Sequence, residues 1–504
     1  MQVPVQATSR GAGGGIPRSE IMLARSRLCG LLLLSVRVSV VMGRLPATEV
    51  RLPAAVEHAG GGVDGLHNAL ARARVHRAAG RDVVVQLHGR YELGETLDLG
   101  AELLPQQQID DTVHGAVTLR GPAVLDGGVK VSGWAKDATR PWLFVANAPA
   151  ALKGTNVTQM WDGARRVVLA RTELMHYNRS GPVNATTMLT DSIITNPGQV
   201  DPALDLTSAR MFIYHTWDVS YHPIALIRSS PEAPGYPSTP EIVTTNKISM
   251  RWNGGGLSGG SGYRFYLEGA EAFLKQGSGM FYHDVAGERL LYAPIDATEP
   301  GVTVVPRLAE LVRSDGVDDV QVESLTFEHS AADFSPCFAP ESACETQSAA
   351  DQIVAALHWS NSQRVTVRNI TVRHTGGYGL WFAVGCHDSS ASFVQMSDLG
   401  AGGVRIGSQT GDAHNISLTD STLEDGGHVW RQGCGVLMQA ANGSTVSHNI
   451  VRRFSYTGIS IGWEWGFGKT GNANSVISSN YISTIGQGQL SDMCVDLPVL
   501  SQEI

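Results

Sequence analysis

The chain has 504 residues, of which 17% are charged, and its formal net charge is −9 at pH 7 without any basic tract. This charge balance argues against nucleic acid as a partner. The 57 glycines suit an architecture with many tight turns, and the length allows two or three domains.

Residues 1–50 are predicted to be a targeting segment. A basic flank precedes a short apolar run from Leu28 to Val36, and small residues follow near Gly43. This order is typical of a secretory signal peptide, here about residues 22–43, and predicts a secreted, extracellular protein. An organellar or meaningless extension is the alternative. The run is too short to span a bilayer well, and no later stretch is long and apolar enough to form a membrane span.

The six cysteines show no zinc-type spacing, so we predict no metal site and no cofactor. They are also too few for a disulfide scaffold. Cys337 and Cys344 flank a short loop and would pair in an oxidising compartment, while two free thiols are the equal alternative.

Residues 51–139 are predicted to hold an N-terminal cap and the first strands. Asp64 is expected to cap a helix that runs to about Ala79. One face of this helix carries four apolar residues, Leu66, Ala69, Leu70 and Ala73. Such a helix would cover the open end of a solenoid. Strand-like runs follow it at 83–87, 93–99 and 117–120.

Residues 140–308 show no regular repeat. They hold several tryptophans and tyrosines, and short strand-like runs alternate with turns. We predict that this segment is an inserted antiparallel β domain.

Residues 309–504 return to a regular rhythm. A phrase of glycine and an apolar residue recurs every twenty to thirty residues, at Gly379-Leu380, Gly403-Val404, Gly435-Val436 and Gly458-Ile459. Segments that alternate apolar and polar residues, such as 365–372 and 416–423, lie between the phrases. Strand-bearing units that recur in this way are typical of a solenoid with a buried apolar column. The fold predicted is an all-β, right-handed parallel β-helix.

Longer phrases, in order along the chain from about Val83 to Asp492, resemble a known family. They are Asp126 to Trp134, Met160 to Arg171, Tyr263 to Glu268, Met280 to Asp284, Asp398 to Arg405, Asp425 to His428, Tyr456 to Gly466 and Leu490 to Met493. The chain resembles the pectin-lyase-like β-helix proteins and, within them, glycoside hydrolase family 141. The resemblance implies hydrolysis of plant or algal cell-wall glycans, with α-L-fucosidase and xylanase activities in the family.

Hydrolysis of this kind needs two carboxyl groups, one acting as acid and one as nucleophile or base. On a β-helix they would come from adjacent coils, about 4.8 Å apart. The candidates are Asp398, Asp425, Glu464 and Asp492. Asp398 and Asp425 are more typical of turn formers because glycine follows closely, whereas Glu464 is equally typical of a buried turn anchor.

The resemblance implies that Asp492 is one catalytic carboxylate. Its partner would then lie one or two coils further on, in a Tyr-Thr-Asp-Glu-Gly-type phrase, and this chain contains no such phrase. We therefore expect the β-helix to be incomplete at its C-terminus and the product to be a poor hydrolase.

Further residues near the coil turns are candidates for binding a polysaccharide or oligosaccharide. Trp463 and Trp465 suit a sugar face, although packing of the turn is an equal alternative. Three side chains are expected to orient a carboxylate, namely His374, His428 and Tyr456. Arg405 is expected to pair with a neighbouring carboxylate.

Two other functions stay open at this point. A glycan-binding or structural β-helix without chemistry would need no carboxylate pair. A polysaccharide lyase would need clustered aspartates for calcium together with a basic catalytic residue, and the sequence shows no such cluster.

Overall fold

A computed structural model describes residues 54–104, 114–204, 206, 208–229, 239–250, 264–337, 339–344, 352–409, 411–462, 471–488 and 490, apart from the side chains of 178 and 336, and the backbone of 502–503. The predicted signal peptide lies outside the described residues, as do Trp463, Glu464, Trp465 and Asp492.

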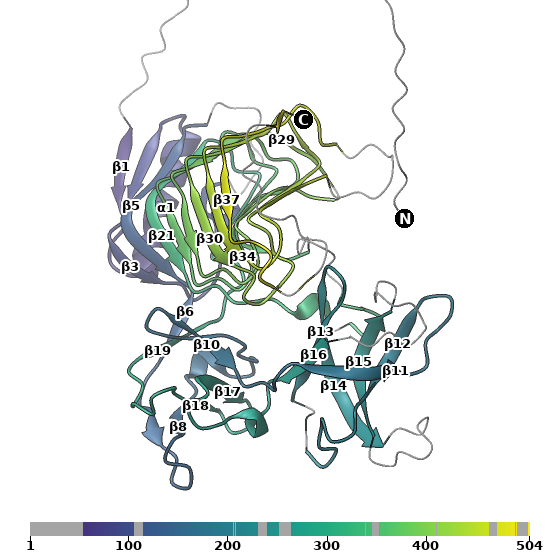
Figure 1. Cartoon of the computed structure of the whole chain (residues 1–504). Coiled ribbons are helices and arrows are strands. Elements are labelled where there is room, and N and C mark those ends of the chain that lie inside the picture. Colours follow the sequence, from purple (N-terminus) through teal and green to yellow (C-terminus); the bar gives the residue numbers. More distant parts are fainter. Residues whose placement is uncertain are drawn as a thin grey trace, which may run out of the picture. The chain divides into compact units, whose positions relative to one another are not determined.

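Most described strands stack in parallel, coil upon coil, in two sheets (Figure 1). The larger sheet receives two strands from most coils. Its strands are β1 (Ala55–His58), β2 (Val83–Gln86), β3 (Gly89–Glu92), β5 (Val117–Asp126), β21 (Val320–Glu328), β23 (Thr366–Arg368), β24 (Thr371–Arg373), β26 (His387–Ser392), β27 (Gln395–Ser397), β29 (Ala413–Thr419), β30 (Thr422–Gly426), β32 (Ala441–Asn442), β33 (Thr445–Ser447), β34 (Ile450–Phe454), β36 (Val476–Ser478), β37 (Tyr481–Ser483) and β38 (Gln502–Glu503).

The smaller sheet takes one strand from each coil. Its strands are β4 (Leu97–Asp98), β20 (Val312–Asp315), β22 (Ala355–Ser360), β25 (Tyr378–Phe382), β28 (Val404–Gly407), β31 (Val436–Gln439) and β35 (Ile459–Ile461). All pairings in this sheet are parallel, which confirms the predicted parallel β-helix.

The interior of the β-helix is built from columns of apolar side chains in register. In β24, β27, β30 and β34 the partners are Val372, Met396, Leu423 and Val451, all of them buried. Because side chains alternate across a strand, one register places a whole column inside. The apolar column predicted from the recurring phrases is present. Its buried residues include Val365, Val367, Ile370, Val372, Leu380, Val404, Ile406 and Val436. Ile459 and Ile461 are partly buried and pack against the same core.

The recurring glycines are explained by close contact between coils. A Cβ atom added to Gly403 would lie 2.6 Å from the carbonyl oxygen of Gly435. One added to Gly435 would lie 2.6 Å from the carbonyl oxygen of Gly458. Each glycine therefore leaves room for the backbone of the next coil, and any side chain there would push two coils apart.

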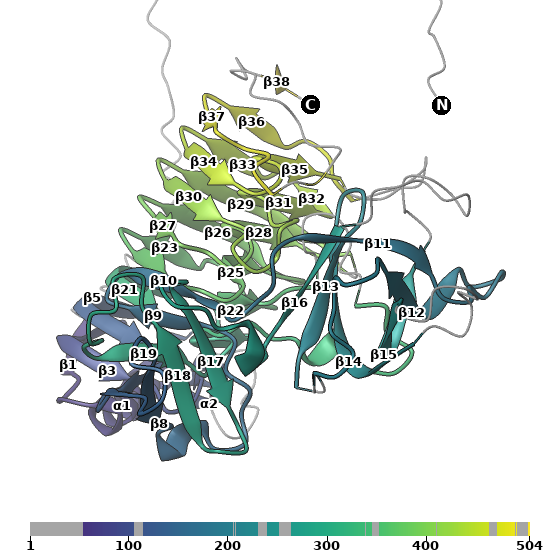
Figure 2. The ribbon, with the colours of Figure 1, turned by 60° about the horizontal axis from the view of Figure 1, so that its bottom comes forward.

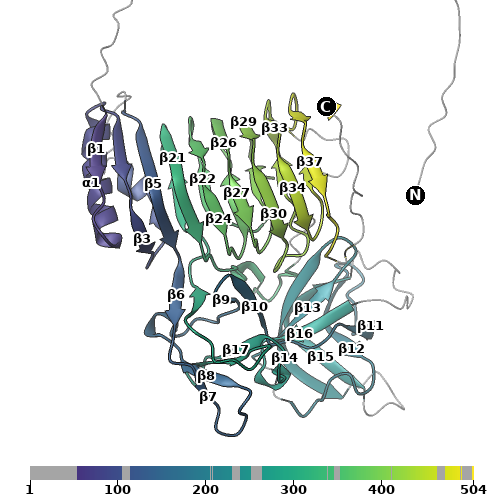
Figure 3. The same ribbon diagram turned by 60° about the vertical axis from the view of Figure 1, so that its left-hand side comes forward.

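The helix α1 (Val63–Ala78) packs beside β1 and β2 at the first coil (Figure 3). Its buried face includes Leu66, Ala69, Leu70 and Ala73, as predicted. The predicted N-cap was wrong. Gly62 occupies that position, and Asp64 lies in the first turn, where a carboxylate favours the helix dipole. A second short helix, α2 (Leu99–Leu103), contacts α1 and is capped by Asp98.

Residues between β5 and β20 form two further β structures (Figure 2). The first is a sheet of β6 (Gly128–Val131), β7 (Ala135–Lys136), β8 (Phe144–Asn147), β9 (Met160–Asp162), β10 (Arg165–Leu169), β17 (Met280–Asp284), β18 (Arg289–Ala293) and β19 (Thr303–Pro306). The second is a closed antiparallel barrel of β11 (Met175–Ser180), β12 (Leu189–Thr195), β13 (Arg210–Tyr214), β14 (Val219–Ser229), β15 (Pro240–Ser249) and β16 (Arg264–Glu268). The first sheet is antiparallel except for the parallel pair β10–β17.

An aromatic cluster joins barrel and β-helix side chains. Tyr221 of β14 packs edge-on against Trp430 and Phe334, with ring centroids 5.0 and 4.7 Å away. Cys337 and Cys344, in the same cluster, form a disulfide, so the paired alternative holds. Three short 3-10 turns, at Ala150–Leu152, Glu271–Phe273 and Ser335–Cys337, complete the described elements. No helix in the described part of the chain is long and apolar enough to cross a membrane.

Candidate functional site

A row of polar residues lies at the C-terminal ends of the strands β21, β24, β27, β30 and β34. They are His329, His374, Asp398, Asp425 and Arg453, and all have φ between 53° and 61°. The strand registers make each the counterpart of the next, one coil further on. Histidine and aspartate are among the residues that tolerate this left-handed conformation. Asp398 lies in a bend directly after β27, as the turn-forming interpretation predicted, whereas Asp425 lies inside β30, near its end. The strand register places the two residues on adjacent coils.

Asp398 is held by three donors, two of them from the eight-stranded sheet. Arg166 Nε donates to Oδ1 at 2.6 Å, while Trp161 Nε1 and His374 Nδ1 donate to Oδ2 at 2.7 and 2.6 Å. The side chain is 13% exposed. Burial acts to raise the pKa of Asp398, but the charge of Arg166 and the bond from His374 outweigh it and hold the pKa below its usual range. Asp398 is thus a fixed anion, suited to positioning its neighbours.

Asp425 is the accessible carboxylate of the row, with 42% of its side chain exposed. His428 Nε2 lies 3.1 Å from Asp425 Oδ1 and 3.7 Å from Asp398 Oδ1. Contact with His428 lowers the pKa of Asp425 against the opposing effect of burial. One ligand-type atom from each of these three residues lies within 4.8 Å of the other two. The arrangement therefore brings two carboxylates of adjacent coils to one histidine.

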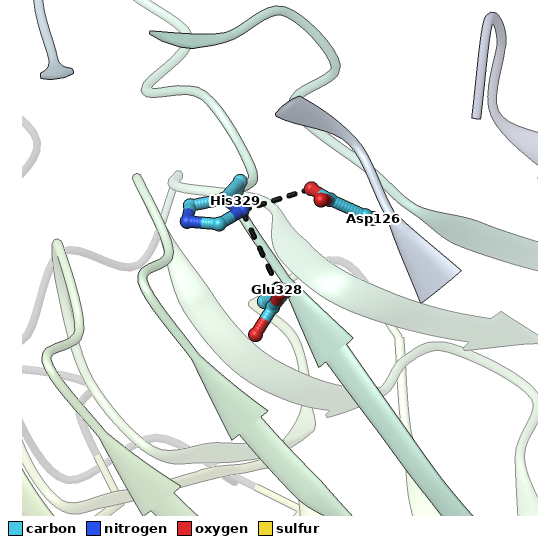
Figure 4. A group of neighbouring side chains, drawn as sticks. All are labelled: Asp126, Glu328 and His329. Carbon is cyan, nitrogen blue, oxygen red and sulfur yellow. Dashed lines mark hydrogen bonds and ion pairs between the residues drawn. The ribbon is translucent and has the colours of Figure 1, made fainter. Parts of the chain in front are cut away.

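A second cluster, formed by Asp126, Glu328 and His329, lies two coils away (Figure 4). It is more deeply buried than the cluster of Asp398, Asp425 and His428. His329 Nδ1 donates to Asp126 Oδ1 at 2.8 Å and lies 3.9 Å from Glu328. Arg90 contacts both carboxylates, and Arg373 donates to Glu328 at 2.8 Å. Because two guanidinium groups already neutralise these carboxylates, the cluster is suited to an internal ion-pair network and not to a metal ion.

Stacked histidines connect the two clusters. The rings of His329 and His374 lie 5.1 Å apart and 14° from parallel. Trp161 packs against both, with centroid distances of 5.3 and 5.6 Å. A polar seam thus runs from Asp126 to Asp425 across adjacent coils.

The remaining predicted residues are placed differently. Arg405 is 1% exposed, and its guanidinium donates to the Ile353 carbonyl at 2.7 Å and lies 3.8 Å from the Trp381 ring. Tyr456 is 5% exposed within the aromatic cluster. Burial keeps both side chains from direct contact with a sugar at the surface. His374 also lies inside, where it orients Asp398 as predicted for a carboxylate partner. Trp463, Glu464, Trp465 and Asp492 lie outside the described residues.

Sequence reasoning missed the two donors from the eight-stranded sheet, Trp161 and Arg166. Both lie in the phrase Met160 to Arg171 that carries the family resemblance, yet nothing local in that phrase points to Asp398, more than 200 residues away. Membership of that phrase was the one sequence feature that could have marked these two residues as functional.

Comparisons with known proteins agree with this architecture. A family model described as "Right handed beta helix region" matches residues 355–491. No curated protein matches the sequence. A solved structure titled "Glycoside hydrolase" superposes with a TM-score of 0.68 at 18% identity, covering 86% of this chain and 84% of that one. The chain is therefore a right-handed parallel β-helix protein.

Two further structures are more distant. The complex of XylC with xylose gives a TM-score of 0.37 at 9% identity, covering 80% of this chain and 57% of that one. The catalytic unit of a GH87 alpha-1,3-glucanase from Streptomyces thermodiastaticus strain HF3-3 gives 0.23 at 12% identity, covering 71% and 70%. Superpositions this weak carry no argument about function.

Proposed function

We propose that this chain is a secreted carbohydrate-active protein of the glycoside hydrolase type, related to glycoside hydrolase family 141 and acting on cell-wall polysaccharides. The observation that carries the proposal is the pair Asp398 and Asp425, which adjacent coils bring to His428. One carboxylate is buried and fixed while the other is accessible, as expected where two acidic groups perform different tasks.

The proposed roles follow from these environments. Asp425 has a lowered pKa and is ionised at neutral pH, so it serves as nucleophile or base. His428 Nε2 lies 3.1 Å from Asp425, where it can accept the proton that Asp425 takes from water when it acts as base, and Asp398 positions His428 and the Arg166 segment. The family resemblance implies only that Asp492 is one catalytic carboxylate. We propose that Asp492 is the general acid and that Asp425 takes the place of the partner phrase that the sequence lacks.

Hydrolysis assays on fucosylated and xylan-type oligosaccharides test this proposal. Asp425→Asn is expected to lower the rate at least about a hundredfold, because it removes a reacting carboxylate. Asp420→Asn is the matched control, since Asp420 is an exposed turn aspartate with φ of 51°. Full activity of Asp425→Asn would refute the assigned role, and full activity of Asp492→Asn would refute the role taken from the resemblance.

A glycan-binding protein without turnover is the second candidate. The hydrogen bonds to Asp398 favour this non-catalytic candidate, because the same bonds would be needed if Asp398 only connected the eight-stranded sheet to the β-helix. Binding of these oligosaccharides without release of products by the unmodified chain, together with unchanged binding by Asp425→Asn, would select this candidate.

Secretion is part of the proposal and rests on the apolar run in residues 22–43. A reporter protein fused to residues 22–50 is expected to reach the medium of a eukaryotic host. Retention of the reporter in the cytosol would refute secretion and leave the carbohydrate role untouched.

A further inference from the structure

Next to His428 lies a small, partly open cavity lined by four arginines. Its volume is about 110 Å³, and its arginines are Arg166, Arg171, Arg210 and Arg431. Since about 10–15 Å³ on this measure holds one water, the cavity has room for an oxyanion group and several waters. We call it the arginine cavity.

The charges around the arginine cavity do not balance. Glu268 is the carboxylate in its lining, and it accepts from Arg210 Nε at 2.5 Å. Asp398 takes the bond from Arg166. Arg171 and Arg431 have no carboxylate partner among the described residues. Two positive charges are therefore in excess in a poorly solvated place, where a buried charge is costly unless a counter-charge is present.

Individual guanidinium groups also have donors to spare. Arg166 Nη1 and Arg431 Nε are buried and have no hydrogen-bond partner among the described residues. Arg171 lies over the Tyr266 ring at 5.1 Å, and Arg210 over the Tyr221 ring at 5.1 Å. Stacking on an aromatic ring fixes a guanidinium plane and leaves its N–H edge available to an anion.

We propose that the arginine cavity binds the oxyanion of an acidic sugar unit, either the carboxylate of a uronic acid or a sulfate ester. Arginine recognises both groups through paired N–H donors. This inference rests on the proposed carbohydrate function and narrows its substrate to an acidic glycan. His428 and Arg166 line the cavity and also contact Asp398, so the bound acidic unit lies beside the carboxylate pair.

A larger cavity nearby shows the opposite charge balance. It has a volume of about 830 Å³, and its charged lining includes Arg210, Asp284 and Asp333. Asp284 is paired with Arg289 and Arg210 is paired with Glu268, so Asp333 leaves one negative charge in excess and this larger space does not select an anion. Discrimination between charged and neutral sugars is therefore a property of the arginine cavity.

Calorimetric titration of the full chain with trigalacturonate and with its methyl ester tests the uronate arm of the inference. A sulfated oligosaccharide and its desulfated form test the sulfate arm. The acidic member of one pair is expected to bind at least about tenfold more tightly than its neutral match, because hydrogen bonds to charged groups are the stronger ones. Equal binding within both pairs, or no binding of either acidic ligand, would overturn the inference.

Charge-removing variants then locate the site. Arg171→Gln and Arg431→Gln are each expected to remove most of the preference for the acidic ligand, because they weaken its binding much more than binding of the neutral one. Arg313→Gln is the matched control, because Arg313 lies on β20, outside the cavity lining, and pairs with Asp98 of β4. Acidic preference that survives both variants, or falls equally in the control, places the anion elsewhere. If a variant fails to fold, the comparison of charged and neutral ligands on the unmodified chain still decides whether the protein prefers an acidic glycan.

These readouts separate the inference from the proposed function. Arginine-dependent binding of an acidic glycan without any hydrolysis would support the anion-binding role of the arginine cavity and refute the hydrolase function. Hydrolysis of neutral glycans that depends on Asp425 and not on Arg171 would support the hydrolase function and refute the anion-binding role.

Discussion

Arg166 and Asp398 form an ion pair of 2.6 Å between residues 232 positions apart in the chain. The arginine belongs to β10 of the eight-stranded sheet, and the aspartate is a corner residue of the β-helix. Arg166 also donates to the carbonyl oxygens of Thr375 and Asp398. The Arg166 guanidinium therefore connects the eight-stranded sheet by hydrogen bonds to two successive coils of the β-helix.

Asp398→Asn tests the strength of this joint. Removing the charge leaves Arg166 in a poorly solvated site without its partner, so the free energy of unfolding is expected to fall by about 3–5 kcal/mol. Chemical denaturation measures the change. Asp388→Asn is the control, because Asp388 is an exposed aspartate paired with a histidine, and little change is expected there. Equal stability of Asp398→Asn and the parent chain would show that the pair contributes nothing.

The buried Asp126 and Glu328 predict a loss of stability in acid. Burial acts to raise both pKa values, but the bond from His329 to Asp126 and that from Arg90 to Glu328 outweigh it, so both are lowered. A lowered folded-state pKa contributes stability above the unfolded value, near 4, and this contribution is lost as the pH falls through the folded value. Urea unfolding is therefore expected to become progressively easier as the pH falls below about 4.

Asp126→Asn removes one of these titrating groups. The variant is expected to be less stable at pH 7 and to show a shallower decline of stability below pH 4. A decline as steep as that of the parent chain would mean that Asp126 does not contribute to the acid sensitivity.

The glycine contacts between coils predict a strong effect of a single methyl group. In Gly435→Ala the new Cβ would lie 2.2 Å from Val451 Cγ1 as well as 2.6 Å from the Gly458 carbonyl oxygen. Overpacking of this kind typically costs about 1–3 kcal/mol, so the melting temperature is expected to fall. Gly61→Ala is the control, because nothing lies within 4 Å of its added Cβ. Similar melting temperatures for the two variants would contradict the contact argument.

The cysteines predict a specific labelling pattern. Burial raises the pKa of Cys386 to about 11 and that of Cys434 to about 12, so neither thiol is expected to react with iodoacetamide at pH 8 in the folded chain. Both should label after unfolding, while Cys337 and Cys344 should label only after reduction as well. Peptide mass spectrometry reads out each site. Labelling of Cys434 in the folded chain would show that its cover opens readily.

Local pattern was sufficient to determine the β-helix. Val404 and Ile406 lie on either side of Arg405, and a glycine like Gly403 recurs before the corresponding strands of later coils. The period and spacing of the sequence therefore predict the same register that the stacked strands show. The helix after Gly62 could also be predicted from its apolar face. Its N-cap residue could not be predicted, because Asp64 and Gly62 both suit a helix start and only the backbone path distinguishes them.

The candidate site depended on tertiary structure. Asp398, Asp425, His374 and His428 were recognisable one by one as residues that suit a turn or a proton transfer. Their division into a fixed anion and an accessible carboxylate was not, because it arises from Trp161 and Arg166 of a distant sheet. The excess charge of the arginine cavity likewise depends on arginines from separate places, namely β10, Arg171 after it, β13 and the segment at Arg431. Burial and charge balance are collective quantities, and the order of residues along the chain determines them only through the folded arrangement.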